Sequence, residues 1–186
     1  GKGRCNLTNT ADVSDAIVHF GPNGRFLRQA FSRFYNSELI AFFKDLGVPT
    51  VIERGGRVFP VSGQAGDITK ALELWTNKCG ATLKTRSQVD QLLVEKGRVF
   101  GVKTSQPSDS TKTSHSQEHR ANHVIVTTGG ASYPATGSTG DGYRLAESVG
   151  HSIRPIMPAL VPLETSGNIA ERIQDLNLRN VSVKLL

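Results

Sequence analysis

Glycines, one arginine and small hydrogen-bonding side chains are concentrated at the start of this 186-residue chain. Glycine lets a backbone approach a ligand closely, arginine supplies a fixed cation, and Asn and Thr supply uncharged donors and acceptors. Such a set suits a polar, planar heterocycle that carries phosphates. Composition alone leaves a second interpretation open, a frayed polar terminus. The candidate binding residues of this segment are Gly3, Arg4, Cys5, Asn6, Thr8 and Asn9.

A glycine pair, Gly129-Gly130, lies shortly after the β-branched run Val124-Ile125-Val126. The run predicts a strand buried on both faces, as parallel strands are, and open α/β sheets bind ligands at the carboxyl ends of such strands. Without a side chain, Gly129 and Gly130 would let a phosphate or ribose lie against the backbone. An ordinary strand followed by a turn is the alternative. The candidates here are Thr128, Gly129 and Gly130.

A third glycine cluster spans residues 137–142 and leads into a predicted short helix over 143–149, closed by Gly150. Asp141 occupies the expected N-cap position. It is therefore predicted to cap the helix, and its carboxylate could also accept a hydrogen bond from a ligand hydroxyl near the positive helix end. The candidates are Asp141 and Gly142.

Histidines recur at every fourth position in His115, His119 and His123, a spacing that would place three metal ligands on one face of a helix. The segment 106–120 contains no aliphatic residue and is rich in Ser, Thr and His, which predicts a solvated loop instead of a helix. We therefore predict no metal site.

The elements that must position these residues alternate between helical and extended patterns, which predicts an α/β fold. Five phenylalanines with helical spacing between residues 26 and 43 are predicted to pack in the core. The paired glycines 55 and 56, and the pair Lys96-Gly97, each predict a hairpin turn. The predicted helices cover 23–46, with a break near 35–36, and 68–79; the predicted strands cover 51–54, 57–60, 81–85, 88–95, 98–104 and 124–126.

Charge and composition restrict the class of protein. The net charge of +6 comes from scattered Lys and Arg, so no dedicated nucleic-acid stripe is visible and no nucleic-acid partner is expected. No apolar run approaches the roughly 20 residues that span a bilayer. Cys5 and Cys79 are far apart in sequence, which fits a reducing compartment and predicts a cytoplasmic protein. Cys5 is expected to be buried and inert.

Four sequences in order carry a resemblance: GRCNLTN at 3–9, GGRVFPVSGQAGDI at 55–68, TTGGASYPATGSTGDGYRLAESVGH at 127–151 and PALVPL at 158–163. Together they resemble the aminoacetone-oxidase-like, or BaiN-like, family of FAD-dependent oxidoreductases. The resemblance implies FAD as cofactor, with NAD(P)H as a candidate electron donor and a small-molecule substrate. It also implies that Val89 holds the adenine through its backbone.

The resemblance further implies a Rossmann-like, glutathione-reductase-type FAD domain of the two-dinucleotide-binding kind, with hairpins, interrupted by an inserted β-rich domain. We expect residues 1–158 to be part of the FAD domain and 159–186 to begin the inserted substrate domain. No G-x-G-x-x-G turn follows a strand in this chain, so the first βαβ phosphate turn is missing and an internal fragment is expected. No catalytic acid or base is identified. A non-catalytic basic α/β module that binds an anionic partner such as RNA is the alternative.

Overall fold

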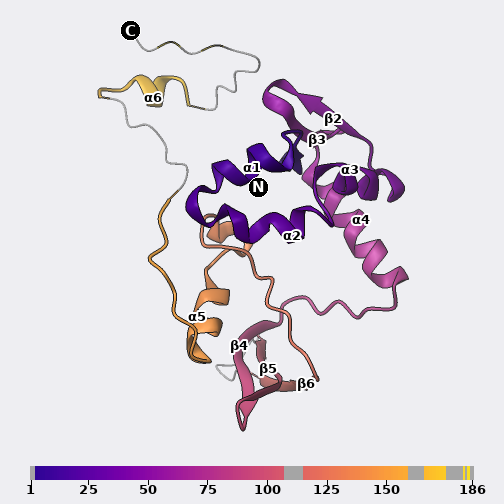
Figure 1. Ribbon diagram of the computed structural model, residues 1–186, viewed down its shortest axis with the longest axis vertical. Coiled ribbons are helices and arrows are strands. Elements are labelled where there is room, and N and C mark those ends of the chain that lie inside the picture. The colour runs from indigo at the N-terminus through magenta and orange to yellow at the C-terminus, as the bar shows by residue number, and fades with distance from the viewer. Residues whose placement is uncertain (1–2, 107–114, 159–165, 175–181, 183, 185–186) are drawn as a thin grey trace. The chain divides into compact units, whose positions relative to one another are not determined.

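The computed structural model describes residues 3–106, 115–158, 166–174, 182 and 184 (Figure 1). The chain divides into two compact units, one comprising Gly1–Leu83 and Leu178–Leu186 and the other Lys84–Asn177. Each unit combines helices with an antiparallel sheet. The prediction of a mixed α/β protein is therefore confirmed. The predicted boundary at 158/159 stays a prediction, because residues 159–165 and 175–181 of the expected inserted domain lie outside the described part.

The sheet of the first unit has the order β1-β3-β2, with β1 (Thr8–Asn9), β2 (Thr50–Glu53) and β3 (Arg57–Pro60). The predicted hairpin between β2 and β3 is confirmed, but its loop is one residue longer than expected, because Glu53 pairs with Arg57. The loop is the 3-10 turn η2 (Arg54–Gly56). Gly55 and Gly56 have φ values of 76° and 73°, a backbone region in which glycine carries no steric cost.

The helical part of this unit consists of α1 (Val13–His19), the 3-10 helix η1 (Gly21–Leu27), α2 (Arg28–Phe31) and α3 (Asn36–Asp45). The predicted break near residues 35–36 is confirmed. Asn36 is the first residue of α3 and not its cap; its side-chain amide donates to the carbonyls of Asn9 (2.9 Å) and Ala11 (2.8 Å). These two bonds fix the start of α3 against the N-terminal segment.

The core of the first unit lies where α3 meets α4 (Ala65–Lys78) and comprises Phe43, Val48, Ile68 and Ala71. The helix predicted over 68–79 is confirmed as α4, and Gly80, with a φ of 76°, follows its C-cap. The prediction that five phenylalanines pack in the core is wrong in part, since Phe26 is 88% exposed.

The second unit contains the sheet β4-β5-β6, with β4 (Gln88–Glu95), β5 (Arg98–Gln106) and β6 (His115–Arg120). The hairpin at Lys96-Gly97 is confirmed, with φ values of 51° and 75°. The prediction of a loop over 106–120 is wrong for residues 115–120, because β6 pairs along β5 and helps bury Thr104, whose hydroxyl donates to the Gln117 carbonyl (3.3 Å). Residues 107–114 of that loop lie outside the described part.

The rest of this unit is formed by η3 (Pro134–Thr136), α5 (Asp141–Ser148) and α6 (Ile169–Arg172). Two predicted strands, 81–85 and 124–126, do not form within the described residues, and Ile125 is 84% exposed. An extended run becomes a strand only when a neighbour pairs with its backbone groups, and no described segment does so here.

Two carboxylates at helix N-termini are expected to make stability depend on acid pH. The backbone N–H of Asp15 lowers the pKa of Asp12, and that of Tyr35 lowers the pKa of Glu38. A lowered folded-state pKa contributes stability that is present above the unfolded value of about 4 and is lost as pH falls through the folded value. Denaturant midpoints between neutral pH and about pH 3 should therefore fall less for an Asp12→Asn/Glu38→Gln variant, whose amides still cap but do not titrate. Parallel pH profiles would contradict this.

Candidate functional site

The GRCNLTN segment, residues 3–9, lies along β3 and against the start of α4 in the first unit. The N–H of Leu7 donates to the carbonyl of Val58 (2.8 Å), and β1 continues this pairing. At the other end, the N–H of Ala65 donates to the carbonyl of Gly3 (2.7 Å). Backbone hydrogen bonds thus hold the segment at both ends, which restricts the directions in which its side chains can point.

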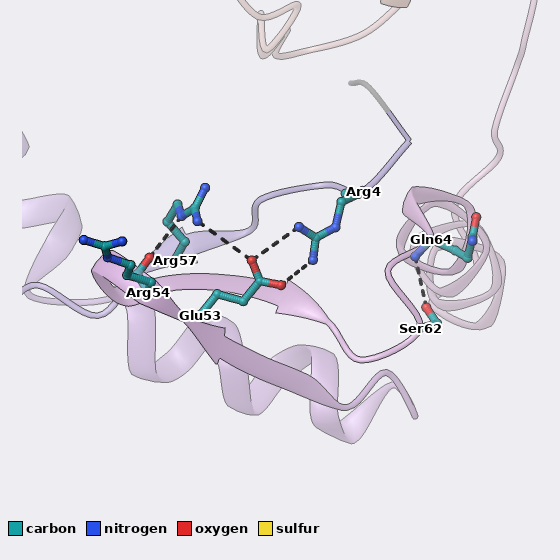
Figure 2. Close-up of polar contacts among 6 residues, drawn as sticks. All are labelled: Arg4, Glu53, Arg54, Arg57, Ser62 and Gln64. Atoms are coloured by element: carbon teal, nitrogen blue, oxygen red, sulfur yellow. Dashed lines mark hydrogen bonds and ion pairs between the residues drawn. The ribbon is translucent and has the colours of Figure 1, made fainter. Parts of the chain in front are cut away.

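Arg4 forms a two-point ion pair with Glu53 at the end of β2 (Figure 2). Its Nη1 lies 3.3 Å from one carboxylate oxygen, and its Nη2 donates to the other. The guanidinium carbon also lies 4.2 Å from the centre of the Phe59 ring, and Arg57 approaches the same carboxylate at 3.9 Å. The hydrogen bond that Arg4 donates to the Glu53 carboxylate raises the pKa of Arg4. Arg4 is therefore a fixed, permanent cation.

One atom of Arg4 is left without a partner. Its Nε is buried, and no acceptor among the described residues reaches it. Buried donors are nearly always satisfied, by protein, water or ligand. The atom therefore marks a place where an acceptor, such as a phosphate or carbonyl oxygen, would be stabilised beside a positive charge.

The other candidates of this segment make internal contacts. The amide of Asn9 donates to the carbonyl of Gly55 (2.7 Å) and accepts from the N–H of Ala11 (2.8 Å). With its amide nitrogen facing the backbone, Asn6 donates to the carbonyls of Thr8 (3.0 Å) and Val58 (3.2 Å). These two side chains shape the segment. A cofactor contact by either stays a prediction.

Cys5 is partly buried and packs against the core of the first unit, while Cys79 is exposed. Both thiols are free. Cys5 has a φ of 60°, a conformation that non-glycine residues adopt at a cost and that clusters at functional segments. Cys5 is thus less buried than expected, and its inert role stays a prediction.

The candidates from the second unit gather at the N-terminus of α5. The N–H of Gly140 donates to the carbonyl of Gly130 (3.2 Å). A Cβ on Gly142 would lie 2.4 Å from the Thr128 hydroxyl oxygen, so glycine permits this close approach. Gly129 has a φ of 76°. The structure thus brings the Thr128-Gly129-Gly130 turn against the first residues of α5.

The prediction that Asp141 is the N-cap of this helix is wrong. Gly140, with a φ of 84°, holds that position, and Asp141 is the first helical residue. Its carboxylate accepts from the Thr139 hydroxyl (3.0 Å) and the Gln88 amide (3.3 Å) and pairs with Arg144 at 3.5 Å. Gly140 occupies the N-cap position because the backbone there has a positive φ, which glycine adopts without steric cost.

Arg144 joins α5 to β4 and was not identified from sequence. Its Nη1 donates to the carbonyl of Asp90 (2.8 Å), and its Nη2 lies 3.5 Å from the carbonyl of Val89. Its i, i+3 spacing from Asp141 was the only local sign of this role. Arg144 thereby places Val89 next to the Asp141 network. The backbone contact of Val89 with the adenine stays a prediction.

Asp141→Asn separates a cofactor contact from a structural role. If Asp141 contributes only to the α5 network, the variant should lose under about 1 kcal/mol of unfolding free energy and bind FAD as before. If the carboxylate accepts from a cofactor hydroxyl, FAD affinity should fall about tenfold. We expect the second result, measured by FAD titration. The matched control is Thr139→Val, which removes a hydrogen bond to the same carboxylate but leaves the carboxylate and the contacts of Arg144 in place.

The described residues contain neither a metal-binding cluster nor a membrane-spanning helix. No group of three or more His, Cys, Asp or Glu side chains is arranged to hold a metal ion there, and Nε2 of His119 lies 3.2 Å from the hydroxyl of Thr104. In the same part of the chain, no helix has the length and apolarity needed to cross a membrane.

Comparison with known proteins gives consistent matches. The family model of the HI0933-like protein Rossmann domain matches residues 1–185. The chain is 36% identical over 165 residues to a 3-dehydro-bile acid delta(4,6)-reductase of Clostridium scindens, with 88% of this chain and 37% of that protein covered. It is 30% identical over 162 residues to a ribosomal RNA dihydrouridine synthase of Haemophilus influenzae, covering 87% and 38%. A protein of the same name from Escherichia coli is 27% identical over 174 residues, covering 94% and 40%. The chain thus spans about two fifths of the length of these relatives.

Proposed function

The chain belongs to the HI0933-like family of FAD-dependent oxidoreductases, and we propose that the protein uses FAD to reduce a carbon–carbon double bond in a ring next to a carbonyl group. The family match over residues 1–185 carries the cofactor part of this proposal, and the names of the relatives carry the reaction class. The resemblance found in the GRCNLTN and TTGGASYP sequences agrees with it.

The described residues fit the cofactor. Arg4 offers a cation with an unsatisfied buried N–H, which suits a phosphate or a flavin carbonyl. In the second unit, the turn at 128–130 packs at the N-terminus of α5, where backbone donors and the helix dipole favour oxygen-rich groups. FAD, when bound, supplies the hydride chemistry, and these residues bind and orient it. The specific assignments of Gly3 to Asn9, Val89 and Asp141 stay proposals.

The proposed reaction class comes from the names of the relatives. A delta(4,6)-reductase and a dihydrouridine synthase both produce a ring with a double bond reduced, by adding a hydride and a proton across it. We extend that class to this protein, with a nicotinamide as the proposed electron donor.

RNA is the second candidate substrate. Two relatives are named for ribosomal RNA, and the chain has a net charge of +6, which would favour a polyanion. RNA is therefore a candidate substrate here, although the sequence alone predicts no nucleic-acid partner. A non-catalytic module is disfavoured by membership in a family of oxidoreductases.

The test begins with the visible spectrum of the purified protein reconstituted with FAD. Bound flavin should show its absorption bands, and NADH or NADPH should bleach them anaerobically. Reoxidation by a steroid enone, and not by ribosomal RNA, is the expected result. A protein that binds no flavin would overturn the proposal, whereas reoxidation by RNA alone would replace the small-molecule substrate with RNA.

A further inference from the structure

An open cavity of about 520 Å³ lies in the first unit between β1 and the helices α1 to α3. Such a volume is within the range of small-molecule sites, roughly 300 to 1,000 Å³. The side chains that line it are Thr8, Asn9, Ala11, Ala16, His19, Phe20, Phe31, Phe34, Tyr35 and Leu39. We call it the aromatic pocket.

Four aromatic side chains belong to its lining. Phe31 stacks on Tyr35 with ring centres 4.6 Å apart, and Phe20 meets Phe31 edge-on at 6.1 Å. Phe20 and Phe34 are 57% and 49% exposed, so the wall remains open to solvent at these rings. Exposed aromatic rings around a cavity provide flat apolar surface that favours a planar apolar ligand.

The pocket has few polar groups. No Lys, Arg, Asp or Glu belongs to its lining. Nδ1 of His19 lies 2.8 Å from the carbonyl of Asp15, which can only accept, so Nδ1 carries the hydrogen and Nε2 is the nitrogen left for a ligand. The Thr8 hydroxyl has only a long 3.5 Å contact with the carbonyl of Asn9. One or two ligand oxygens could be bound by these groups.

Thr8 and Asn9 belong both to this lining and to the segment proposed to bind the flavin. We propose that the aromatic pocket binds the ring system of the substrate, and that this is a fused, largely apolar ring system with a carbonyl group. This inference rests on the proposed function, because it places the substrate beside the cofactor segment.

A nucleobase within RNA fits the same pocket poorly. A single pyrimidine ring would fill a small part of about 520 Å³. The flanking phosphates of RNA require cations, and the lining provides none. An apolar polycyclic ligand gains from the full aromatic surface and needs only the few polar groups present.

The experiment fills the pocket and measures ligand binding directly. Ala16 lines the pocket on α1, whereas Val18 on the same helix is 75% exposed and outside the lining. Progesterone, a four-ring enone, and uridine monophosphate are titrated calorimetrically into the protein, once with FAD added and once without it. Progesterone should bind with one-to-one stoichiometry and a negative heat-capacity change. Ala16→Phe should weaken its binding at least tenfold, and Val18→Phe less than twofold.

Absence of progesterone binding, equal affinity in Ala16→Phe and the parent, or tighter binding of uridine monophosphate would each overturn the inference. If Ala16→Phe fails to fold, Phe34→Ala decides: removing this half-exposed ring should also weaken progesterone binding at least threefold, and unchanged affinity would overturn the inference. Failure of the proposed function is recognised separately, since it would leave progesterone binding intact while the flavin bands or the reduction of the enone are missing.

Discussion

Gly24→Ala should unfold the helical segment of the first unit. A Cβ at this position would lie 2.1 Å from the carbonyl oxygen of Ile17 and 3.0 Å from its carbonyl carbon. Both atoms are backbone, so the clash cannot be relieved by a side-chain rotation, and Ile17 is itself buried. We expect a loss of about 3 kcal/mol or more in unfolding free energy, measured by urea denaturation.

The matched control is Gly66→Ala in α4. Nothing lies within 4 Å of a Cβ built there, and the residue is helical. Alanine lowers the entropy of the unfolded chain and favours the helix, so this variant should gain roughly 0.5 to 1 kcal/mol. Equal stability of the two variants would show that η1 and α1 do not approach each other as described.

Glu53→Leu should lower FAD affinity at least tenfold without altering any residue of the segment 3–9. The carboxylate is the two-point partner of Arg4, and its loss leaves a partly buried guanidinium without that partner. Arg4 would then turn toward solvent, and its buried Nε would leave the position proposed here to bind the cofactor. FAD titration followed by flavin fluorescence measures the effect.

Arg57→Leu is the control for this prediction. Arg57 approaches the same carboxylate only at 3.9 Å, and its side chain is half exposed. It should change FAD affinity less than threefold. If Glu53→Leu binds FAD as tightly as the parent, then Arg4 does not contribute to the cofactor site through this pair.

Features fixed by short stretches of sequence were predicted correctly. The hairpins at Gly55-Gly56 and Lys96-Gly97 require a positive φ at adjacent residues. Glycine favours this conformation, so the turns can be predicted from the glycines themselves. The end of α4 at Gly80 follows the same rule. The GRCNLTN segment has an unusual set of residue types within a few positions, and its role in cofactor binding stays a prediction.

Features that depend on distant partners were not predicted. The strand β6 has no apolar pattern, and only its pairing with β5 makes it a strand. Conversely, the apolar run 124–126 has the pattern of a strand, but no described segment pairs with it. Glu53 lies 49 residues from Arg4 in sequence, so nothing near either residue indicates their ion pair.

The composition of β6 has a consequence for behaviour at high concentration. Its residues, His-Ser-Gln-Glu-His-Arg, form one edge of the β4-β5-β6 sheet and include no aliphatic side chain. An open sheet edge invites pairing with another chain, and charged or strongly hydrated side chains discourage it. Replacing Glu118 and Arg120 with Val would give this edge the character of an aggregation-prone strand. The polar sequence therefore acts as protection against edge-to-edge self-association.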